Sequence, residues 1–335
     1  MQTRSVLALL FGLLLGTASS FGQFSFASID VPNSMATWAS GIGPAGQIVG
    51  GYMDASGREH GYLYEDGTFT TIDVPGSLVG LPALTKLETE VNGINPRGDM
   101  VGDYFAPPGA PDAPGCTVAF APACRKGFLY SRGEFSSVLV PSHVGSVASA
   151  ITPDGTIYGC LHDQTFGNEM IGFIRIPHGN GKSFDYETLQ AGDGEVTDPS
   201  QSSQSRLNSM NNAATPDGNI IVGLYTPPGA ARPHGYTVIN GHFADYMFPG
   251  SVATQVWGIN PNGDFVGFYR DSAGVHGFLQ PGDGSAPVPV NYVNPDTGAT
   301  ASLTEALGIN PAGAIVGTFL DSMGQHGFVT VRTSD

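Results

Sequence analysis

The sequence predicts an all-β protein, a six-bladed β-propeller in which each blade has four antiparallel strands. Two observations carry this prediction. The chain contains 48 glycine and 25 proline residues and only 13% charged residues, a composition typical of short strands joined by tight turns. In addition, one motif recurs six times along the chain. Radial repetition of four-stranded sheets is the architecture that such a repeat favours.

The recurring motif is a strand-like run around a Pro-x-Gly turn, followed by a Gly-aromatic pair. Its copies are GIGPAGQIVGGY from Gly41, GINPRGDMVGDY from Gly93, AITPDGTIYGCL from Ala150, AATPDGNIIVGLY from Ala213, GINPNGDFVGFY from Gly258 and GINPAGAIVGTF from Gly308. In the fifth copy, four strand-like runs are separated by the turn signals PNG, DSAG and GDG. Each copy is therefore expected to form one blade, with cores near residues 35–77, 87–141, 144–190, 207–250, 252–293 and 302–335.

The beginning of the expected domain repeats the end of a unit. Residues 26–34 read FASIDVPNS, and residues 69–77 read FTTIDVPGS. The sixth copy stops after its third strand, at HGFVTVRTSD. Residues 23–34 are therefore predicted to supply the missing fourth strand of the sixth blade. This pairing closes the ring and covers the sheet edges.

Residues 1–22 have the layout of a secretory signal peptide. Arg4 precedes the apolar run VLALLFGLLLG, and Ala18 and Ser20 are the small residues of a cleavage site. The run is shorter than the roughly 20 residues that cross a bilayer. We therefore expect residues 23–335 to be a single exported propeller domain with no membrane span.

The cysteines and the net charge narrow the expected environment and partners. Cys116 and Cys124 bracket the segment CTVAFAPAC, and this spacing favours a disulfide in an exported protein. Cys160, in the strand-like run TIYGCL, is expected to be a buried and inert thiol. A formal charge of −16 disfavours nucleic acid as a partner. The expected partner is an extracellular glycan or protein, and the expected state is a monomer.

Residues that recur from unit to unit are expected to be structural. The repeated histidines are His60, His234, His276 and His326. They should lie far apart around the ring, so each is predicted to bond to the Asp of the preceding turn (Asp54, Asp271 or Asp321). A column of hydroxyl residues is expected to satisfy backbone groups at the start of each innermost strand. This column comprises Thr37, Thr89, Ser146, Ser209, Thr254 and Thr304.

The next position along each unit is irregular, which is more informative about function. It holds Trp38, Glu90, Val147, Met210, Gln255 and Glu305. If this column borders the channel mouth, Trp38 and Gln255 are candidate ligand contacts. Glu90 and Glu305 are candidate catalytic residues. Together with Gln255, they would bind a polar ligand or a cation such as calcium. No resident cofactor and no metal-ligand set is predicted.

Four segments depart from the repeat and are expected on the face where the innermost strands begin. They are residues 78–88, 106–124, 161–170 and 191–206. Such loops often carry binding and catalysis. Glu88 and Arg206 are candidate ligand contacts there, and the candidate catalytic residues are His162, Asp163 and Glu169. His162 with either acid would be a general base or a metal ligand. Glu90 and Glu305 would be a glycosidase pair if roughly 5 to 9 Å apart.

The repeated motifs resemble the HAF family of extracellular repeat proteins, whose units combine a GIN-x-x-G-x-VVG segment with a His-Ala-Phe triplet. In this chain the triplet appears as HGF or HGY in four units and lacks its histidine in the second and third. The resemblance implies an exported repeat protein, and it implies no particular activity.

Three functions remain open from the sequence. The first is a secreted, non-catalytic propeller that binds a glycan or protein on the loop-rich face of the second and third blades. The second is an extracellular hydrolase or lyase that acts on a polysaccharide with carboxylates or a histidine near the channel mouth. The third is a surface structural protein without a small ligand. The sequence contains no HExxH, GxSxG or DxDxDG motif, which favours the first.

Overall fold

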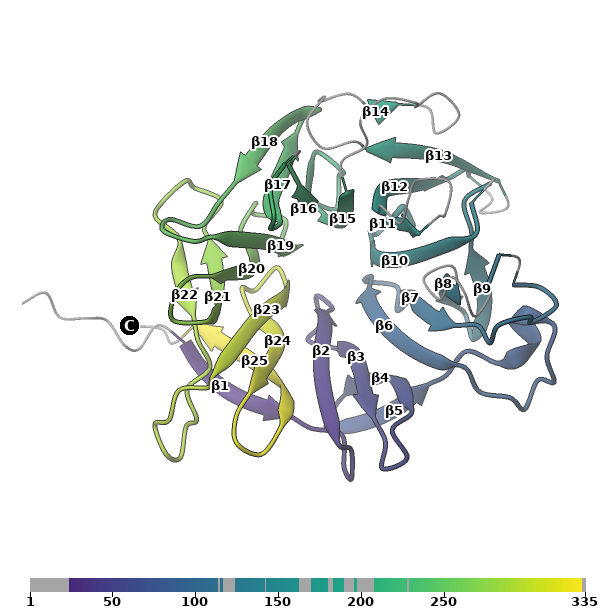
Figure 1. Cartoon of the computed structure of the whole chain (residues 1–335), viewed down its shortest axis with the longest axis horizontal. Coiled ribbons are helices and arrows are strands. Elements are labelled where there is room, and N and C mark those ends of the chain that lie inside the picture. The colour runs from purple at the N-terminus through teal and green to yellow at the C-terminus, as the bar shows by residue number, and fades with distance from the viewer. Residues whose placement is uncertain are drawn as a thin grey trace, which may run out of the picture.

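The computed structural model describes residues 24–113, 115–116, 124–141, 143–162, 170–179, 183–189, 196–197, 208–227 and 229–332. These residues form an all-β propeller, as predicted, with the first strand of each repeat unit nearest the centre of the ring (Figure 1). Their only helical element is the short 3-10 helix η1 (Gly76–Val79). Within this part of the chain, no helix is long and apolar enough to cross a membrane. The predicted signal peptide lies outside the described residues and stays a prediction.

Four repeat units form antiparallel sheets of their own, with strands in chain order from the centre outwards. The first has β2 (Ala36–Ile42), β3 (Ile48–Met53), β4 (Glu59–Glu65) and β5 (Thr68–Ile72). The second has β6 (Glu88–Ile94), β7 (Met100–Phe105), β8 (Arg125–Ser131) and β9 (Glu134–Val138). The third has β10 (Gly145–Ile151), β11 (Ile157–His162), β12 (Met170–Pro177), β13 (Phe184–Leu189) and the short β14 (Val196–Thr197). The fourth has β15 (Asn208–Ala214), β16 (Ile220–Thr226), β17 (His234–Ile239) and β18 (His242–Tyr246).

The fifth and sixth units share one eight-stranded sheet, so the prediction of six separate four-stranded sheets is wrong here. The fifth unit contributes β19 (Ala253–Ile259), β20 (Phe265–Arg270), β21 (Val275–Gln280) and β22 (Val288–Val290). The sixth contributes β23 (Leu303–Ile309), β24 (Ile315–Leu320), β25 (Gln325–Arg332) and β1 (Phe24–Ile29). A single parallel pair, Val275 with Leu303, joins the two groups. Four blades therefore have sheets of their own among the described residues, and this pair merges the sheets of the other two units.

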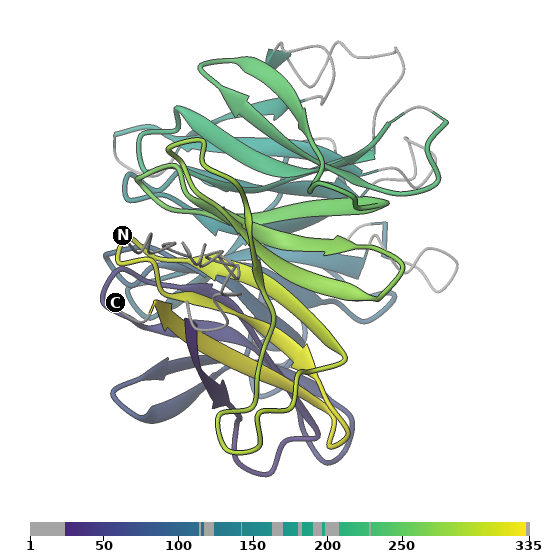
Figure 2. The same ribbon diagram turned by 90° about the vertical axis from the view of Figure 1, so that its left-hand side faces the viewer.

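The N-terminal strand completes the last unit, as predicted. β1 pairs antiparallel with β25 from Phe24 opposite Arg332 to Ile29 opposite Gly327, and Figure 2 shows the two strands side by side. His326 Nδ1 lies 2.8 Å from Asp30 Oδ1, which adds a side-chain contact between the chain ends. Pairing of residues so distant in sequence closes the ring.

The hydroxyl column satisfies buried backbone groups, as predicted, but the donors belong to the preceding unit and not to the start of the innermost strand. Each hydroxyl of the Ser and Thr column accepts a hydrogen bond from a backbone N–H that lies either just after the fourth strand or within the third strand of the preceding unit. These side chains are at most 2% exposed, so they satisfy donors that burial would otherwise leave unpaired. His60 Nε2 forms the predicted hydrogen bond with Asp54 Oδ2 at 3.2 Å. His276 Nε2 and His326 Nε2 lie 3.3 Å and 3.4 Å from the Asp of the preceding turn, and neither atom has a hydrogen-bond partner within the described structure. The fourth histidine differs, because His234 contacts Asp245.

The glycine of the GIN motif lets neighbouring innermost strands approach one another. A Cβ atom added to Gly41 would lie 2.7 Å from the carbonyl oxygen of Asn92 in the next unit. A Cβ atom added to Gly308 would lie 3.2 Å from the Cα atom of Gly41, across the closure of the ring. Substitution at either position would therefore push the innermost strands apart.

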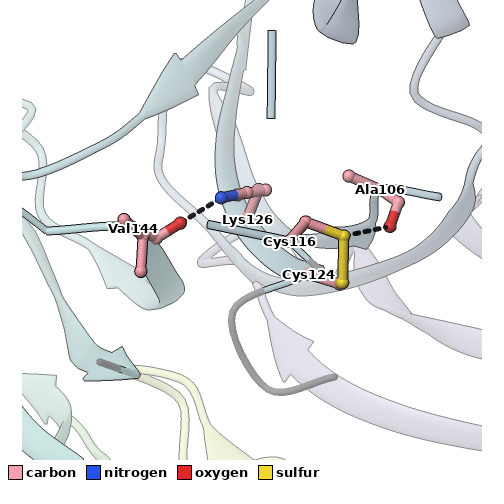
Figure 3. The surroundings of a disulfide bond; sticks show 5 residues. All are labelled: Ala106, Cys116, Cys124, Lys126 and Val144. Atoms are coloured by element: carbon pink, nitrogen blue, oxygen red, sulfur yellow. Dashed lines mark hydrogen bonds between the residues drawn. A yellow bond between two sulfur atoms is a disulfide. The ribbon is translucent and has the colours of Figure 1, made fainter. Parts of the chain in front are cut away.

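The described part of the insertion in the second unit is packed against that unit. Cys116 and Cys124 form the predicted disulfide, which lies near Ala106 and the buried Lys126 (Figure 3). The Lys126 Nζ atom donates a hydrogen bond to the carbonyl oxygen of Val144. Both cysteines belong to the same hydrophobic cluster as Val79 at the end of η1, so the connection before β6 and the insertion stabilise each other.

Candidate functional site

The centre of the ring holds a cavity of about 540 Å³ lined by the innermost strand of every unit. Its volume falls within the range of roughly 300–1,000 Å³ that is usual for small-molecule sites. Side chains two residues apart on a strand share one face, so each innermost strand contributes side chains at up to three levels. We call these the upper, middle and lower layers, in the order in which each strand passes them.

The lower layer is almost wholly aliphatic. It consists of Ile42, Ile94, Ile151, Ala214, Ile259 and Ile309. Each of these residues occupies the isoleucine position of the GIN motif in its unit. The upper layer is mixed and consists of Trp38, Glu90, Val147, Met210 and Glu305. Five members of the irregular sequence column therefore line the cavity. The sixth, Gln255, is not among the lining residues, but its Oε1 accepts a hydrogen bond from Trp257 Nε1 at 3.3 Å.

The upper layer has an acidic half and an apolar half. Glu90, Glu305 and the neighbouring Asp103 face the cavity from the second and sixth units. Val147 and Met210, from the third and fourth units, belong to an apolar cluster with Cys160 and Leu224. A ligand in the cavity would therefore meet carboxylates on one side and hydrocarbon on the other.

Trp38 is held in a defined orientation within the acidic half, between Glu90 and Glu305. Its Nε1 donates a hydrogen bond to Glu90 Oε1 at 2.7 Å. The indole ring lies against Gly51 on the paired strand β3, where an added Cβ atom would come within 2.4 Å of the ring. The indole ring therefore occupies the space that a side chain at position 51 would fill, and the hydrogen bond to Glu90 fixes the orientation of the ring. A ring immobilised in this way loses little entropy when it contacts a ligand.

Glu90 belongs to a network with Asp103 and Arg125 in the second unit. Asp103 pairs directly with Glu90 across β6 and β7, and its side chain is 2% exposed. Arg125 Nε lies 2.8 Å from Asp103 Oδ2, and Arg125 Nη2 lies 3.6 Å from Glu90 Oε2. Burial raises the pKa of Glu90, and the nearby charge of Asp103 raises it further, while Arg125 opposes both effects.

Three other carboxyl groups have pKa values raised by burial, and of these Asp103 and Glu305 line the cavity whereas Glu59 does not. Burial raises the pKa of Glu59, at the start of β4, to about 7, and the charge of Glu90 contributes next. Burial also raises the pKa of Glu305, and the charge of Arg270 opposes that shift. No hydrogen bond or ion pair reaches the Glu305 carboxylate from the described residues. Carboxyl groups with such shifts in a cavity are candidates for ligand contact or proton transfer.

The middle layer was not predicted as a site, although period-two alternation from the irregular column would have found it. It consists of Ser40, Asn92, Ser149, Asn212, Trp257 and Leu307. In all six innermost strands this residue is the extra one of a β-bulge, a feature that re-aims side chains. Ser149 is 8% exposed and Asn212 is 2% exposed. Ser149 Oγ and Asn212 Oδ1 have no hydrogen-bond partner within the described structure.

Trp257 and Phe268 add an aromatic wall in the fifth unit. Their ring centroids are 6.3 Å apart with an interplanar angle of 19°, and both residues line the cavity. The chain has two tryptophans, and both are therefore cavity residues. Aromatic faces of this kind stack on flat apolar surfaces and attract cations.

His162 is placed in a buried pair with Cys160 and not in the cavity wall. The distance from Cys160 Sγ to His162 Nε2 is 3.2 Å. Burial raises the pKa of the Cys160 thiol to about 12 and lowers that of His162 to about 4. Both groups are therefore neutral near pH 7, and Cys160 is fully buried, so the pair does not form the thiolate that a cysteine nucleophile requires. The expected buried thiol is confirmed.

The remaining predicted site residues are not brought to the cavity by the described structure. Glu88 is exposed at the start of β6 and does not line the cavity. Asp163, Glu169 and Arg206 lie outside the described residues. Among the residues that are described, no group of three His, Cys, Asp or Glu side chains is arranged to hold a metal ion.

Comparison with known proteins gives similarity in fold alone. No family model matches the chain, and no curated protein matches it. A gluconolactonase from Xanthomonas campestris is 14% identical, with 90% of this chain and 88% of that chain covered and a TM-score of 0.42. A sialidase from Trypanosoma rangeli is 8% identical, with 91% and 56% covered and a TM-score of 0.44, so the chain spans little more than half of that protein. YCF48 bound to a D1 peptide is 10% identical, with 94% and 97% covered and a TM-score of 0.40.

Proposed function

We propose that this protein is a secreted, monomeric propeller of the HAF type that binds an extracellular glycan in its central cavity. We count six structural units in the ring, because each of the six innermost strands carries the same bulge and the same turn. In this count the eight-stranded sheet represents two units. The proposed site is built by the innermost strands, whereas the sequence predicts it on the loop-rich face of the second and third units.

The observation that carries the proposal is the combination of aromatic and carboxylate groups in one cavity. Trp38, Trp257 and Phe268 present aromatic surface, while Glu90 and Glu305 present hydrogen-bond acceptors. A sugar ring needs both, because its C–H face is apolar and its hydroxyl groups donate hydrogen bonds. Ser149 and Asn212 add polar oxygens without partners among the described residues.

Tryptophan fluorescence is a direct assay, because both tryptophans line the cavity. Titration of the protein with neutral oligosaccharides of several backbones is expected to shift the emission of the wild type. Trp38→Ala and Trp257→Ala should each weaken binding by about tenfold, a loss of roughly 1.4 kcal/mol that is usual for an aromatic contact. Phe69→Ala, in the outer strand β5, is the control for a general loss of stability and should bind as the wild type does. Absence of binding to any member of the panel would contradict the proposal.

A polysaccharide hydrolase or lyase is the second candidate. It is favoured by Glu90 and Glu305, two carboxyl groups with raised pKa values that line the same cavity on either side of the first unit. Such a pair can supply a general acid and a base or nucleophile. The test is the release of new reducing ends or unsaturated ends from polysaccharides that bind. If the wild type releases them and Glu90→Gln and Glu305→Gln abolish the release, the protein is an enzyme.

A further inference from the structure

We propose that the preferred ligand is an amino sugar, bound through its protonated amine by the acidic half of the cavity. This inference rests on the proposed glycan-binding function and specifies the substrate class of the same site. It follows from the balance of charged groups in the cavity wall, from the partners that these groups already have, and from the placement of the aromatic rings.

The charged side chains that line the cavity are three carboxylates and one guanidinium, Glu90, Asp103, Glu305 and Arg125. The guanidinium is already engaged, since its Nε lies 2.8 Å from Asp103 Oδ2 and its Nη2 lies 3.6 Å from Glu90 Oε2. It therefore compensates the two carboxylates of its own unit and offers little to an anionic ligand. The wall as a whole carries excess negative charge when its carboxyl groups are ionised.

Glu305 is the carboxylate best placed to take an external cation. It lines the cavity from β23, on the other side of the first unit from Arg125. None of the described residues donates a hydrogen bond to it or forms an ion pair with it. Because Glu305 is half-buried, an incoming ammonium group would interact with it in a medium of lower dielectric than water, where opposite charges attract more strongly.

The aromatic groups favour the same ligand chemistry. Trp38 lies on β2, between the strands that carry Glu90 and Glu305, and Trp257 and Phe268 face the cavity from the fifth unit. The negative face of an indole ring attracts an ammonium group as well as the apolar face of a sugar. A hexosamine unit presents both features within one ring. The formal charge of −16 on the whole chain would attract a cationic glycan and repel a polyuronate.

The test compares three tetrasaccharides by tryptophan fluorescence at low salt and near-neutral pH. They are β-1,4-linked glucosamine, the same chain with every amine acetylated, and a tetragalacturonate. We expect the wild type to bind the glucosamine chain about tenfold more tightly than the acetylated chain, and to bind the galacturonate most weakly. Added salt should reduce this preference only in part, because a partly buried charge pair is screened less than an exposed one.

Variants then separate the role of Glu305 from that of the fold. Glu305→Gln keeps the shape of the side chain and should lower the ratio of the glucosamine affinity to the acetylated-chain affinity from about ten to about one. Glu134→Gln, at the exposed start of β9, removes one negative charge away from the cavity and should bind all three sugars as the wild type does. Thermal unfolding of both variants controls for stability.

The possible outcomes are distinct. Equal affinity for the glucosamine and acetylated chains would overturn the amino-sugar inference and leave glycan binding intact, as would tightest binding to the galacturonate. If none of the three sugars binds, and the wider neutral panel also fails, the proposed function itself is wrong. A preference for glucosamine that persists in Glu305→Gln would also overturn the inference as stated, since it assigns the amine to this carboxylate.

Discussion

Replacement of Ile29 by alanine tests whether the N-terminal strand holds the ring closed. Ile29 is the last residue of β1, is 7% exposed, and packs in a cluster with Ala39, Ile48, Tyr62 and Val316. Truncation of a buried isoleucine to alanine costs 2–5 kcal/mol in protein cores, so its near-complete burial places the cost of Ile29→Ala at about 3 kcal/mol. If β1 detached from the last unit part of the time, Ile29 would be exposed to water in that state, and Ile29→Ala would lower the stability of the protein by less than about 3 kcal/mol.

Ile72 provides a matched control within the same molecule. It ends the outer strand β5 of the first unit, is 8% exposed, and pairs with Gly61 as Ile29 pairs with Gly327. Its strand is joined to its own unit by a tight turn, whereas β1 reaches the last unit from the other end of the chain. If β1 is a full member of the last unit, Ile29→Ala and Ile72→Ala should destabilise the protein equally, each by about 3 kcal/mol.

Guanidinium unfolding followed by tryptophan fluorescence measures both free energies. Trp38 and Trp257 lie on β2 and β19, on both sides of the sixth unit. A cost below about 0.5 kcal/mol for Ile29→Ala, together with the expected cost for Ile72→Ala, would refute the argument that β1 closes the ring. Removal of residues 23–34 as a whole should lower the melting temperature much more than either substitution.

Three further predictions concern buried groups. The pKa of Glu59 is raised from 4.5 to about 7, so the folded protein holds a proton that the unfolded chain releases, and stability should fall as pH rises from about 4.5 to 7. Glu59→Gln should therefore raise the free energy of unfolding by about 1 kcal/mol at pH 8 and leave it unchanged at pH 4.5. Thermal unfolding measured across this pH range checks the prediction. The charged groups around Glu59 are Glu90, Arg125, Asp103 and Glu88. Thr89→Val should lower the free energy of unfolding in urea by about 2 kcal/mol, because it leaves the buried Val74 N–H without its acceptor. If the variant and the wild type are equally stable, water replaces the hydroxyl group. Joint replacement of Cys116 and Cys124 by serine should cost about 2 kcal/mol, as expected for so short a loop, and a reductant should lower the stability of the wild type to the same level and leave the variant unaffected.

Local and repetitive features of this protein were predictable from its sequence. The turn residues Pro, Asp and Gly recur at fixed offsets and impose the same backbone path in each unit. The disulfide followed from similar short-range reasoning and is confirmed. The hydroxyl column satisfies backbone groups as predicted, but its donors come from the preceding unit. Ring closure was predictable because the surplus strand at the start of the chain matches the strand missing at the end.

Two features of the fold and the site could not be obtained in this way. The bridge between Val275 and Leu303 depends on how closely two units approach, which no local pattern encodes. Arg125 follows an insertion, and only pairing of β7 with β8 brings it beside Asp103 and Glu90. His162 appeared accessible in the sequence, but its strand places it against Cys160 in a buried pair.

The sequence by itself determined the all-β repeat, the order of strands within a unit and the strand that closes the ring, because each depends on alternation and turn chemistry over a few residues. Tertiary structure alone decided which side chains share the central cavity. Trp38, Glu90, Trp257 and Glu305 come from four different units, and the free energy of their contacts depends on distances across the ring. The chemistry of the candidate site is therefore a property of ring closure, since the cavity has a complete wall only when all the units are in place.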